Sequence, residues 1–439
     1  MEELLVWKPS WTAKEMLTSI ILGGRTHHVR FAASEELGGR EADCLLALTV
    51  LPAMATASRL KLPESVSCKL LSSLPRIQDV YCSWEELFRR VTVDVPKGGR
   101  ESTASARPSD NVACFFSGGV DSFYTALKHR DEISHLILVH GCFDTYPDNQ
   151  SIRIRNSHIA HEVAKELGKS LIEVETDIRS FSDPLISWAY YHGSALFSVA
   201  LLFQHLFRKV LIPSTHTYAD LFPWGSHPVL DPLWSTELTE LAHEGCEATR
   251  VEKVAYISKH EVAMKWLHVC QRHPTEDTED YNCGHCEKCL RTMLNLKAVG
   301  ALELCETLPH DLKPADVENI RLSSGKNAQL RRNNIAFAQE NLKALEKLGT
   351  ESALARAVAN SIDKSTDELA QTRVQLRRTQ AKLAAARKRN RALLESRRYK
   401  LAKTLMDKAF RVPLVNTLLR RKKVTRDEIP NQETSRPPT

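Results

Sequence analysis

The chain has 439 residues, 42% of them hydrophobic, which is enough for two or three domains with packed cores. No run of about 18 apolar residues occurs, so the sequence predicts no membrane-spanning helix. The first residues lack the pattern of a secretory signal. Seven of the eleven cysteines are scattered without a pattern, which argues against a disulfide framework. We therefore expect a cytoplasmic protein, either free or peripheral to the inner membrane face.

The net charge of +6 is distributed unevenly. Residues 373–426 contain 19 Lys and Arg against two acids, a net charge of +17 that leaves −11 for the rest of the chain. An acidic body with a basic tail argues against a catalytic domain that clamps a long nucleic acid. The tail is where we expect any contact with a polyanion or a membrane surface.

Residues 1–105 are expected to form an N-terminal α/β module. Apolar runs lie at 44–54 and 66–74, and residues 90–95 alternate like a strand. The following segment, 96–110, is rich in Gly, Ser and Pro and is expected to be a linker. The module either covers an active site or binds an acceptor molecule, and the sequence leaves both roles open.

The next region, 106–262, alternates between strand and helix patterns. The predicted strands are 111–116, 135–140, 170–175, 209–213 and a last one near 252–257. The predicted helices are 122–130, 152–167 and 185–207. This alternation predicts a parallel sheet with helices on both faces, in which ligands bind at the carboxyl ends of the strands.

The motif SGGVDS follows the first strand of this region and opens the first helix. Gly118 and Gly119 let the backbone approach a ligand closely. The amides of the turn and of the first helical turn then point at one spot that favours negative charge. Asp121 can orient the turn or hold Mg²⁺. The motif therefore predicts a site for the phosphates of ATP, formed by Phe116, Ser117, Gly118, Gly119, Val120, Asp121 and Ser122.

Four cysteines further along the chain have the spacing of metal ligands. The pattern C-x12-C-x2-C-x2-C consists of Cys270, Cys283, Cys286 and Cys289. Four thiolates leave no coordination position open for water, so the expected role is structural. Zn²⁺ is favoured over an iron–sulfur cluster, because Gly284, Glu287 and Lys288 resemble a zinc-knuckle turn and no Cys-Pro pair follows.

The remaining residues are expected to be helical and then disordered. We predict a zinc-binding and helical subdomain at 263–362, a basic tail at 363–426 and disorder at 427–439. In the tail, a heptad pattern predicts a short coiled coil that could form a homo-oligomer. Basic residues flank an apolar stripe at 399–410, which favours contact with a membrane surface or a protein. The heptad positions are Leu369, Thr372, Leu376, Thr379, Leu383, Ala386, Asn390 and Leu393.

The two motifs together resemble a known family. SGGVDS is similar to the signature of the PP-loop N-type ATP pyrophosphatases, which have an adenine nucleotide α hydrolase-like fold. Followed by CGxCxxC, it resembles the 7-cyano-7-deazaguanine synthases over about residues 110–300. The resemblance implies cleavage of ATP between the α and β phosphates, adenylation of a carboxylate, attack by ammonia and a structural zinc. It also implies that adenine lies along His140 and Gly141, and that Asp144 lies beside the phosphate turn.

The chain departs from this family at residues 214–235, where the family's Asp-Cys-Arg substrate motif is missing. We therefore expect a different acceptor. Arg155 could hold the α-phosphate or a substrate carboxylate, although a solvated helix face explains it equally well. Gly193 lies inside a predicted helix, which indicates close packing or the approach of a ligand beside His192. The predicted catalytic residues are Asp121, Asp144, Arg155, His192 and His216.

The function expected from the sequence is that of an ATP-dependent ligase. It would adenylate a small carboxylate, release pyrophosphate and transfer ammonia or an amine, with ATP, Mg²⁺ and Zn²⁺ as cofactors. Two alternatives stay open. One is a PP-loop sulfur transferase that acts on RNA, which needs an iron–sulfur cluster or a persulfide. The other is a nucleotide-binding scaffold that oligomerises through its tail.

Overall fold

The structure is a computed structural model. It describes residues 2–38, 41–96, 110–142, 150–270, 281–320, 322, 328–347, 353–396, 400–401 and 403–405. The chain divides into two compact units, Met1–Ser365 and Thr366–Thr439. Among the described helices, none is long and apolar enough to cross a membrane.

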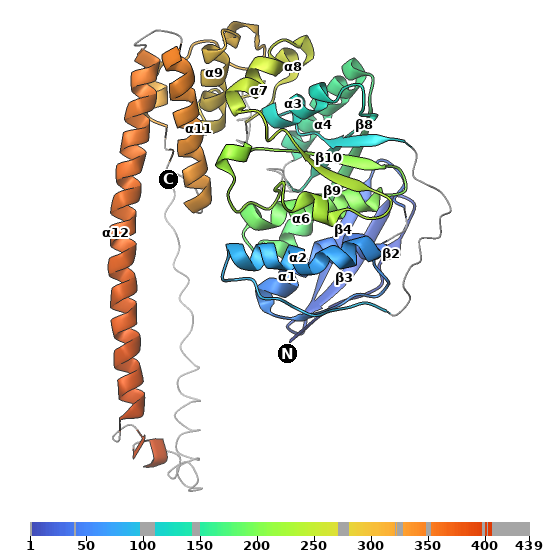
Figure 1. Cartoon of the computed structure of the whole chain (residues 1–439), viewed down its shortest axis with the longest axis vertical. Coiled ribbons are helices and arrows are strands. Elements are labelled where there is room, and N and C mark those ends of the chain that lie inside the picture. The colour runs from blue at the N-terminus through green and yellow to red at the C-terminus, as the bar shows by residue number, and fades with distance from the viewer. Residues whose placement is uncertain are drawn as a thin grey trace, which may run out of the picture. The chain divides into compact units, whose positions relative to one another are not determined.

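A mixed sheet organises the first unit (Figure 1). Within the described residues it has 11 strands, in the order β11-β10-β7-β8-β9-β4-β3-β1-β5-β6, with β2 paired to β3. The strands are β1 (Glu3–Val6), β2 (Ser10–Trp11), β3 (Glu15–Leu22), β4 (Arg25–Ala33), β5 (Arg59–Lys61), β6 (Val93–Asp94), β7 (Val112–Phe115), β8 (His135–His140), β9 (Ser170–Thr176), β10 (Lys209–Pro213) and β11 (Glu240–Glu244).

The described part of the chain has twelve α-helices, several of which cover the two faces of the sheet. They are α1 (Glu41–Thr56), α2 (Cys68–Trp84), α3 (Val120–Lys128), α4 (Gln150–Leu167), α5 (Ile178–Ser182), α6 (Trp188–Leu202), α7 (Arg250–Ile257), α8 (Glu261–Trp266), α9 (Glu287–Ala298), α10 (Pro314–Glu318), α11 (Ala328–Lys347) and α12 (Ala353–Glu395). Successive residues of β7 enter different cores, since Ala113 packs with α1 and α6 whereas Cys114 packs with α3 and α9. The α/β class predicted from the alternating pattern is thus confirmed.

The five strands that carry the motif region are parallel to one another. β11, β10, β7, β8 and β9 pair in this order, and each pairing is parallel. β7, which leads into the SGGVDS turn, lies between β10 and β8. Four of the five predicted strands therefore lie where the sequence predicted them.

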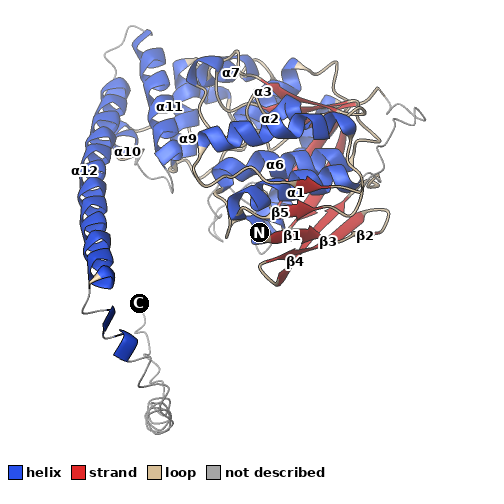
Figure 2. Cartoon of the chain, turned by 60° about the horizontal axis from the view of Figure 1, so that its bottom comes forward, coloured by secondary structure: helices blue, strands red, loops and turns tan. Residues whose placement is uncertain are grey.

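The N-terminal strands continue the same sheet. β4 pairs antiparallel with β9, through Phe31 and Thr176 among others, and β3, β1 and β5 follow. Figure 2 shows β1, β3 and β4 side by side at this edge. Leu4 and Phe31 belong to the same buried core as Val139 and Phe197. The N-terminal residues therefore share a core with the parallel strands. Residues 97–109, most of the expected linker, lie outside the described part of the chain.

The strand predicted near 252–257 is wrong, because these residues form helix α7. Thr249 accepts a hydrogen bond from the backbone amide of Glu252, and the Glu252 carboxylate accepts one from the backbone amide of Thr249. This capping box starts a helix at a site where β-branched residues favoured a strand. Lys253, Val254 and Ile257 are buried on one face of α7, a helical spacing. The fifth parallel strand is instead β11.

A close backbone crossing explains the glycine inside α6. A Cβ atom at Gly193 would lie 1.9 Å from the carbonyl oxygen of Gly225, so the loop after η1 (Tyr218–Asp220) runs directly over the helix. The amide of Gly225 donates to the carbonyl of Ala189, which fixes the crossing. Of the two explanations expected for Gly193, close packing is the one that the structure contains. The crossing places Trp224 against His192, with ring centroids 5.0 Å apart.

Gly193→Ala should destabilise the protein, although Gly→Ala inside a helix normally stabilises it. The expected loss is about 1–3 kcal/mol, because the added methyl group meets backbone that cannot move aside cheaply. Urea-induced unfolding of the two proteins measures the difference. A gain of roughly 1 kcal/mol, the ordinary effect of helix propensity, would contradict the crossing.

Candidate functional site

A cavity of about 480 Å³ opens at the carboxyl ends of β7, β8, β10 and β11. Its volume is in the range of small-molecule sites. Helices α3, α4, α6, α7, α9 and α11 also contribute to the wall, together with residues 268–270 and with Trp224 and Ser226 from the loop that crosses α6. Six residues of the predicted phosphate site line the cavity: Phe116, Ser117, Gly119, Val120, Asp121 and Ser122.

The SGGVDS turn presents a bare helix N-terminus to this cavity. Gly118 has a φ of +74°, a left-handed conformation that favours glycine, and Gly119 is the N-cap of α3. Among the described residues, no side chain caps α3. The Ser122 hydroxyl donates to the carbonyl of Gly119 at 2.9 Å and closes the turn. The first amides of α3 are thus available to an anionic ligand.

Asp121 is held by two cations from α7. Its carboxylate lies 3.1 Å from Nη1 of Arg250 and 3.3 Å from Nζ of Lys253, and Lys253 also donates to the carbonyl of Ser214. Burial raises the pKa of Asp121, but Lys253 and Arg250 outweigh burial, so the pKa is lowered and the carboxylate is charged. The positive charge beside the turn thus depends on α7.

Arg250 and Lys253 were not predicted as site residues, since a strand near 252–257 does not indicate that Lys253 shares a face with Arg250. In a helix, residues three apart lie on one face, so both side chains reach Asp121. In a strand they would point to opposite faces of the sheet. The available signal was the capping box of Thr249 and Glu252, which marks a helix start.

A second buried guanidinium lies nearby, on α9. Arg291 is only 8% exposed, and its Nη1 lies 3.4 Å from a carboxylate oxygen of Glu287. The guanidinium carbon of Arg291 is 4.3 Å from the ring centroid of Phe337, and that of Arg250 is 5.7 Å from the same ring. The Nε atoms of both arginines are buried without a hydrogen-bond partner in the described structure. Two desolvated guanidinium groups around one phenyl ring form a site that an anion would stabilise.

His192 and His216, two predicted catalytic residues, lie near the cavity in different surroundings. Nδ1 of His192 faces the carbonyl of Trp188 at 3.0 Å, and its Nε2 accepts from the amide of Ser226 at 3.2 Å. Burial lowers the pKa of His192 to about 4. Both ring nitrogens are thus engaged, which favours a positioning role for His192, and its catalytic role stays a prediction.

His216 is buried against aromatic rings rather than paired with polar groups. Its ring stacks on Phe337 with centroids 6.2 Å apart, and Phe222 lies 4.4 Å away on another side. Nε2 is buried without a partner in the described structure. Burial lowers the pKa of His216 to about 3, so the ring is neutral near pH 7. Its predicted role as a base stays a prediction.

His243, near the end of β11, was not predicted as a site residue. Its Nδ1 lies 2.7 Å from a carboxylate oxygen of Asp231, which is fully buried, and the Ser226 hydroxyl donates to the same oxygen. Burial lowers the pKa of His243, but Asp231 and a hydrogen bond with Cys246 outweigh it and raise the pKa to about 9. Because His243 lines the cavity, this buried ion pair forms part of its wall.

The other residues predicted around the nucleotide lie in several places. His140 bonds Glu173 at 2.8 Å, and a Cβ atom at Gly141 would lie 1.9 Å from the carbonyl of Thr176, so this glycine permits close packing. Arg155 on α4 is half-buried, with Nε and Nη2 lacking partners in the described structure. None of these three residues is among the described residues that line the cavity. Asp144 lies outside the described residues.

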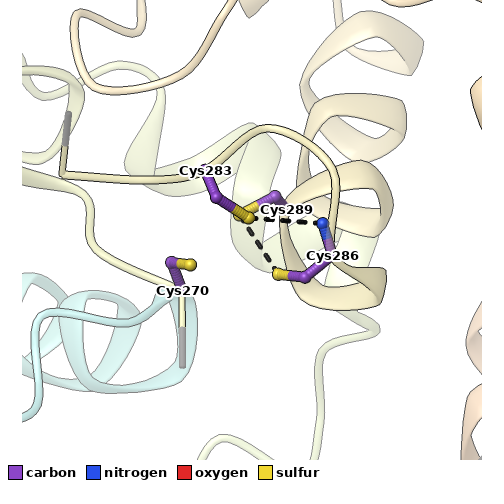
Figure 3. A group of neighbouring side chains, drawn as sticks. All are labelled: Cys270, Cys283, Cys286 and Cys289. Carbon is purple, nitrogen blue, oxygen red and sulfur yellow. Dashed lines mark hydrogen bonds between the residues drawn. The ribbon is translucent and has the colours of Figure 1, made fainter. Parts of the chain in front are cut away.

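The four predicted metal-ligating cysteines converge (Figure 3). Their sulfur atoms all lie within 4.8 Å of one another, with 3.8 Å between Cys283 and Cys289 and 3.4 Å between Cys286 and Cys289. A tetrahedral zinc site with bonds of about 2.3 Å needs sulfur atoms about 3.8 Å apart. A hydrogen bond with Cys270 raises the pKa of the Cys286 thiol to about 11, so thiolates here require a cation. The cluster could therefore hold a metal ion such as Zn²⁺.

Asn282, which was not predicted from the sequence, joins the segment before the first cysteine of the cluster to the segment that contains the other three. Its carbonyl oxygen accepts from the amides of Val269 and Cys270 at 2.9 and 3.1 Å, and its amide nitrogen donates to the carbonyls of Leu267 and Thr307. The side chain is 1% exposed. It therefore fixes Cys270 beside Cys283. A single Asn next to a cysteine gives no sequence signal for this role.

The cysteine cluster is connected to the phosphate turn by a short segment. The amide of His268, two residues before Cys270, donates to the carbonyl of Gly118 at 2.8 Å. Cys270 and Lys288 also line the cavity. A metal bound by the four cysteines would thus stabilise one wall of the cavity and the turn itself.

Comparison with known proteins found no relative of this chain. The chain matches none of the family models, curated proteins or solved structures with which it was compared.

Cys286→Ser should destabilise the protein by roughly 3 kcal/mol or more, because metal binding at four thiolates is coupled to folding. Thermal unfolding with metal analysis by mass spectrometry measures both the stability and the stoichiometry. Cys68→Ser is the control, since Cys68 is exposed and outside the cluster. A Cys286→Ser protein that kept the stability of the parent would contradict a structural metal site.

The ion pair of His243 and Asp231 should make stability depend on pH. The folded-state pKa of about 9 is above the ordinary value of about 6.5, so the stabilisation is complete below pH 6.5 and is lost as the pH rises through 9. We expect the free-energy difference between the parent protein and His243→Gln to shrink by ~2–3 kcal/mol from pH 6 to pH 9.5. Urea unfolding at both pH values measures it. Parallel pH profiles for the two proteins would show that the pair does not form.

Proposed function

We propose that this protein is an ATP pyrophosphatase of the PP-loop type that adenylates a substrate carboxylate. One observation carries the proposal: an uncapped helix N-terminus, after a glycine turn at the end of a central parallel strand, faces a cavity beside buried cations. Amides and cations in a desolvated site stabilise phosphate oxygens strongly. The residue pattern SGGVDS supports the same function.

The triphosphate of ATP would bind along the turn of Ser117–Ser122. The first amides of α3 would donate hydrogen bonds to the β and γ phosphates, and Arg250 and Arg291 would stabilise the charge that develops on the departing pyrophosphate. Asp121 keeps Arg250 and Lys253 oriented toward the turn. Mg²⁺ that arrives with ATP would neutralise further phosphate charge.

Adenine would lie beside β8 and α4, where Leu138, Val139 and Ile152 line the cavity. The acceptor would occupy the opposite end, between Trp188 and Trp224 and next to His243. There its carboxylate would attack the α-phosphate to form an acyl-adenylate and pyrophosphate, and ammonia or an amine would then displace AMP. Residues 214–235 lack the Asp-Cys-Arg substrate motif of the family that the chain resembles, which supports a different acceptor.

Zn²⁺ at Cys270, Cys283, Cys286 and Cys289 would be structural, since four thiolates complete its coordination. It would hold the His268 segment against Gly118 and so maintain the turn. A colourless protein with one zinc supports this reading, whereas absorbance near 400 nm would indicate an iron–sulfur cluster and favour the sulfur transferase.

Asp121→Asn should lower the rate of pyrophosphate release by about 100-fold or more, because Arg250 and Lys253 lose the anion that orients them. The measurement is pyrophosphate release from ATP in the presence of a library of small acids, with unfolding by urea as the check on folding. Asp131→Asn, at an exposed aspartate in the turn after α3, is the control.

Nucleotide binding is followed separately through the fluorescence of Trp188 and Trp224, which line the cavity. If the parent protein bound ATP but released no pyrophosphate with any acid, the scaffold reading would replace the enzymatic one. If Asp121→Asn released pyrophosphate at the parent rate, the proposed role of the buried ion cluster would be wrong.

A further inference from the structure

The second unit contains the distal part of a long helix, and most of this part carries positive charges only. α12 runs through Ala353–Glu395 (Figure 1), and the second unit begins at Thr366. From residue 371 to 394 the sequence has eight Lys and Arg and no Asp or Glu. All side chains described between Gln371 and Glu395 are exposed. Within the second unit, the described side chains on every side of this part of the helix are therefore exposed to solvent.

The cations leave one stripe of the helix uncharged. At 3.6 residues per turn, residues spaced alternately four and three apart fall on one line along a helix. Between residues 379 and 393 this line contains no charged residue. Leu383 is 50% exposed and Leu393 is 62% exposed, so its leucines are uncovered. The described members of the stripe are Thr379, Leu383, Ala386, Asn390 and Leu393.

The positions next to the stripe are basic. Lys382 and Arg389 each precede a stripe residue, and Arg387 follows one. In a coiled coil these are the g and e positions, whose side chains meet those of the partner helix. Between residues 374 and 394, no e or g position holds an acid. The flanks of the stripe therefore select a partner by charge.

This charge pattern disfavours a second copy of the chain. In a parallel pair, Lys382 of one helix would face Arg387 of the other, and in an antiparallel pair the flanks would again place cation against cation. Like charges across an interface repel and suppress that pairing. The expected homo-oligomer is thus not the assembly that these residues favour.

The isolated helix also carries internal repulsion. Arg378 and Lys382 are four residues apart, as are Arg387 and Arg391, and like charges at this spacing destabilise a helix. An ion pair offsets part of this repulsion, with 3.3 Å between Nε of Arg391 and a carboxylate oxygen of Glu395. Acidic side chains from a partner would relieve the repulsion and stabilise the helix.

A membrane surface fits the stripe less well than a helix does. Membrane-bound amphipathic helices present a continuous apolar face, whereas this stripe includes Thr379, Ala386 and Asn390 between its leucines. A polar residue such as Asn390 at a core position is instead typical of coiled coils, where it specifies the register.

We propose that this stripe of α12 docks an acidic amphipathic helix of a different protein, with Lys382, Arg387 and Arg389 paired to its Glu or Asp side chains. The complex is a two-stranded coiled coil. It is independent of the proposed ATP chemistry, because none of these residues lines the cavity.

The probe is a synthetic peptide of four heptads with Leu at d, Val at a, one Asn opposite Asn390 and Glu at every e and g position. Its control peptide has Lys at e and g. The full chain should bind the Glu peptide with a gain in helicity by circular dichroism, and should be monomeric without it by sedimentation. Leu383→Asn with Leu393→Asn should lower the affinity by about tenfold or more.

Two triple variants with the same change in net charge distinguish ion pairs at the e and g positions from nonspecific electrostatic attraction to the helix. The triple variant K382E/R387E/R389E should weaken binding of the Glu peptide by about tenfold or more and bind the Lys peptide instead. The triple variant R377E/R378E/R391E changes the net charge equally but lies away from the flanks, and it should keep the affinity within about threefold. Equal weakening by both triples, binding unaffected by the leucine changes, or self-association of the chain alone would overturn the proposal.

Discussion

The candidate site depends on one buried ion cluster, in which Asp121 holds Arg250 and Lys253. Asp121 belongs to the first turn of α3, and the two cations belong to α7, more than 120 residues later. The cluster therefore joins the bare N-terminus of α3 to the positive wall of the cavity. Removing one partner of a buried ion pair leaves an uncompensated charge, so folding relies on all three side chains, and the proposed anion binding would rely on them as well.

The cysteine cluster extends this constraint from the other side. Asn282 fixes Cys270 beside Cys283, and the amide of His268 bonds the carbonyl of Gly118. The phosphate turn is thus supported by α7 on one side and by the cysteine cluster on the other. α9, which begins at the cluster, also carries Arg291 into the cavity wall. The cysteine cluster and the cavity wall therefore share helix α9.

Much of this arrangement could be predicted from local patterns. The SGGVDS turn and the four cysteines are contiguous or regularly spaced, so sequence alone located both. Arg250, Lys253 and His243 could not be found in this way, because their roles depend on which elements pack together. Because a strand was predicted at 252–257, Arg250 and Lys253 were not expected to share one face. The β-branched residues there are instead buried by a helix. The extension of the sheet through β4 is a long-range pairing that has no local signal.

The central claim is that the turn of Ser117–Ser122 binds the phosphates of ATP. The most direct test is a crystal structure with a non-hydrolysable analogue that has a methylene group between the α and β phosphates. We expect the β and γ phosphates on the first amides of α3, within reach of Arg250 and Arg291, with adenine beside β8. A triphosphate bound elsewhere in the molecule, or a turn that stays empty at saturating analogue, would contradict the claim.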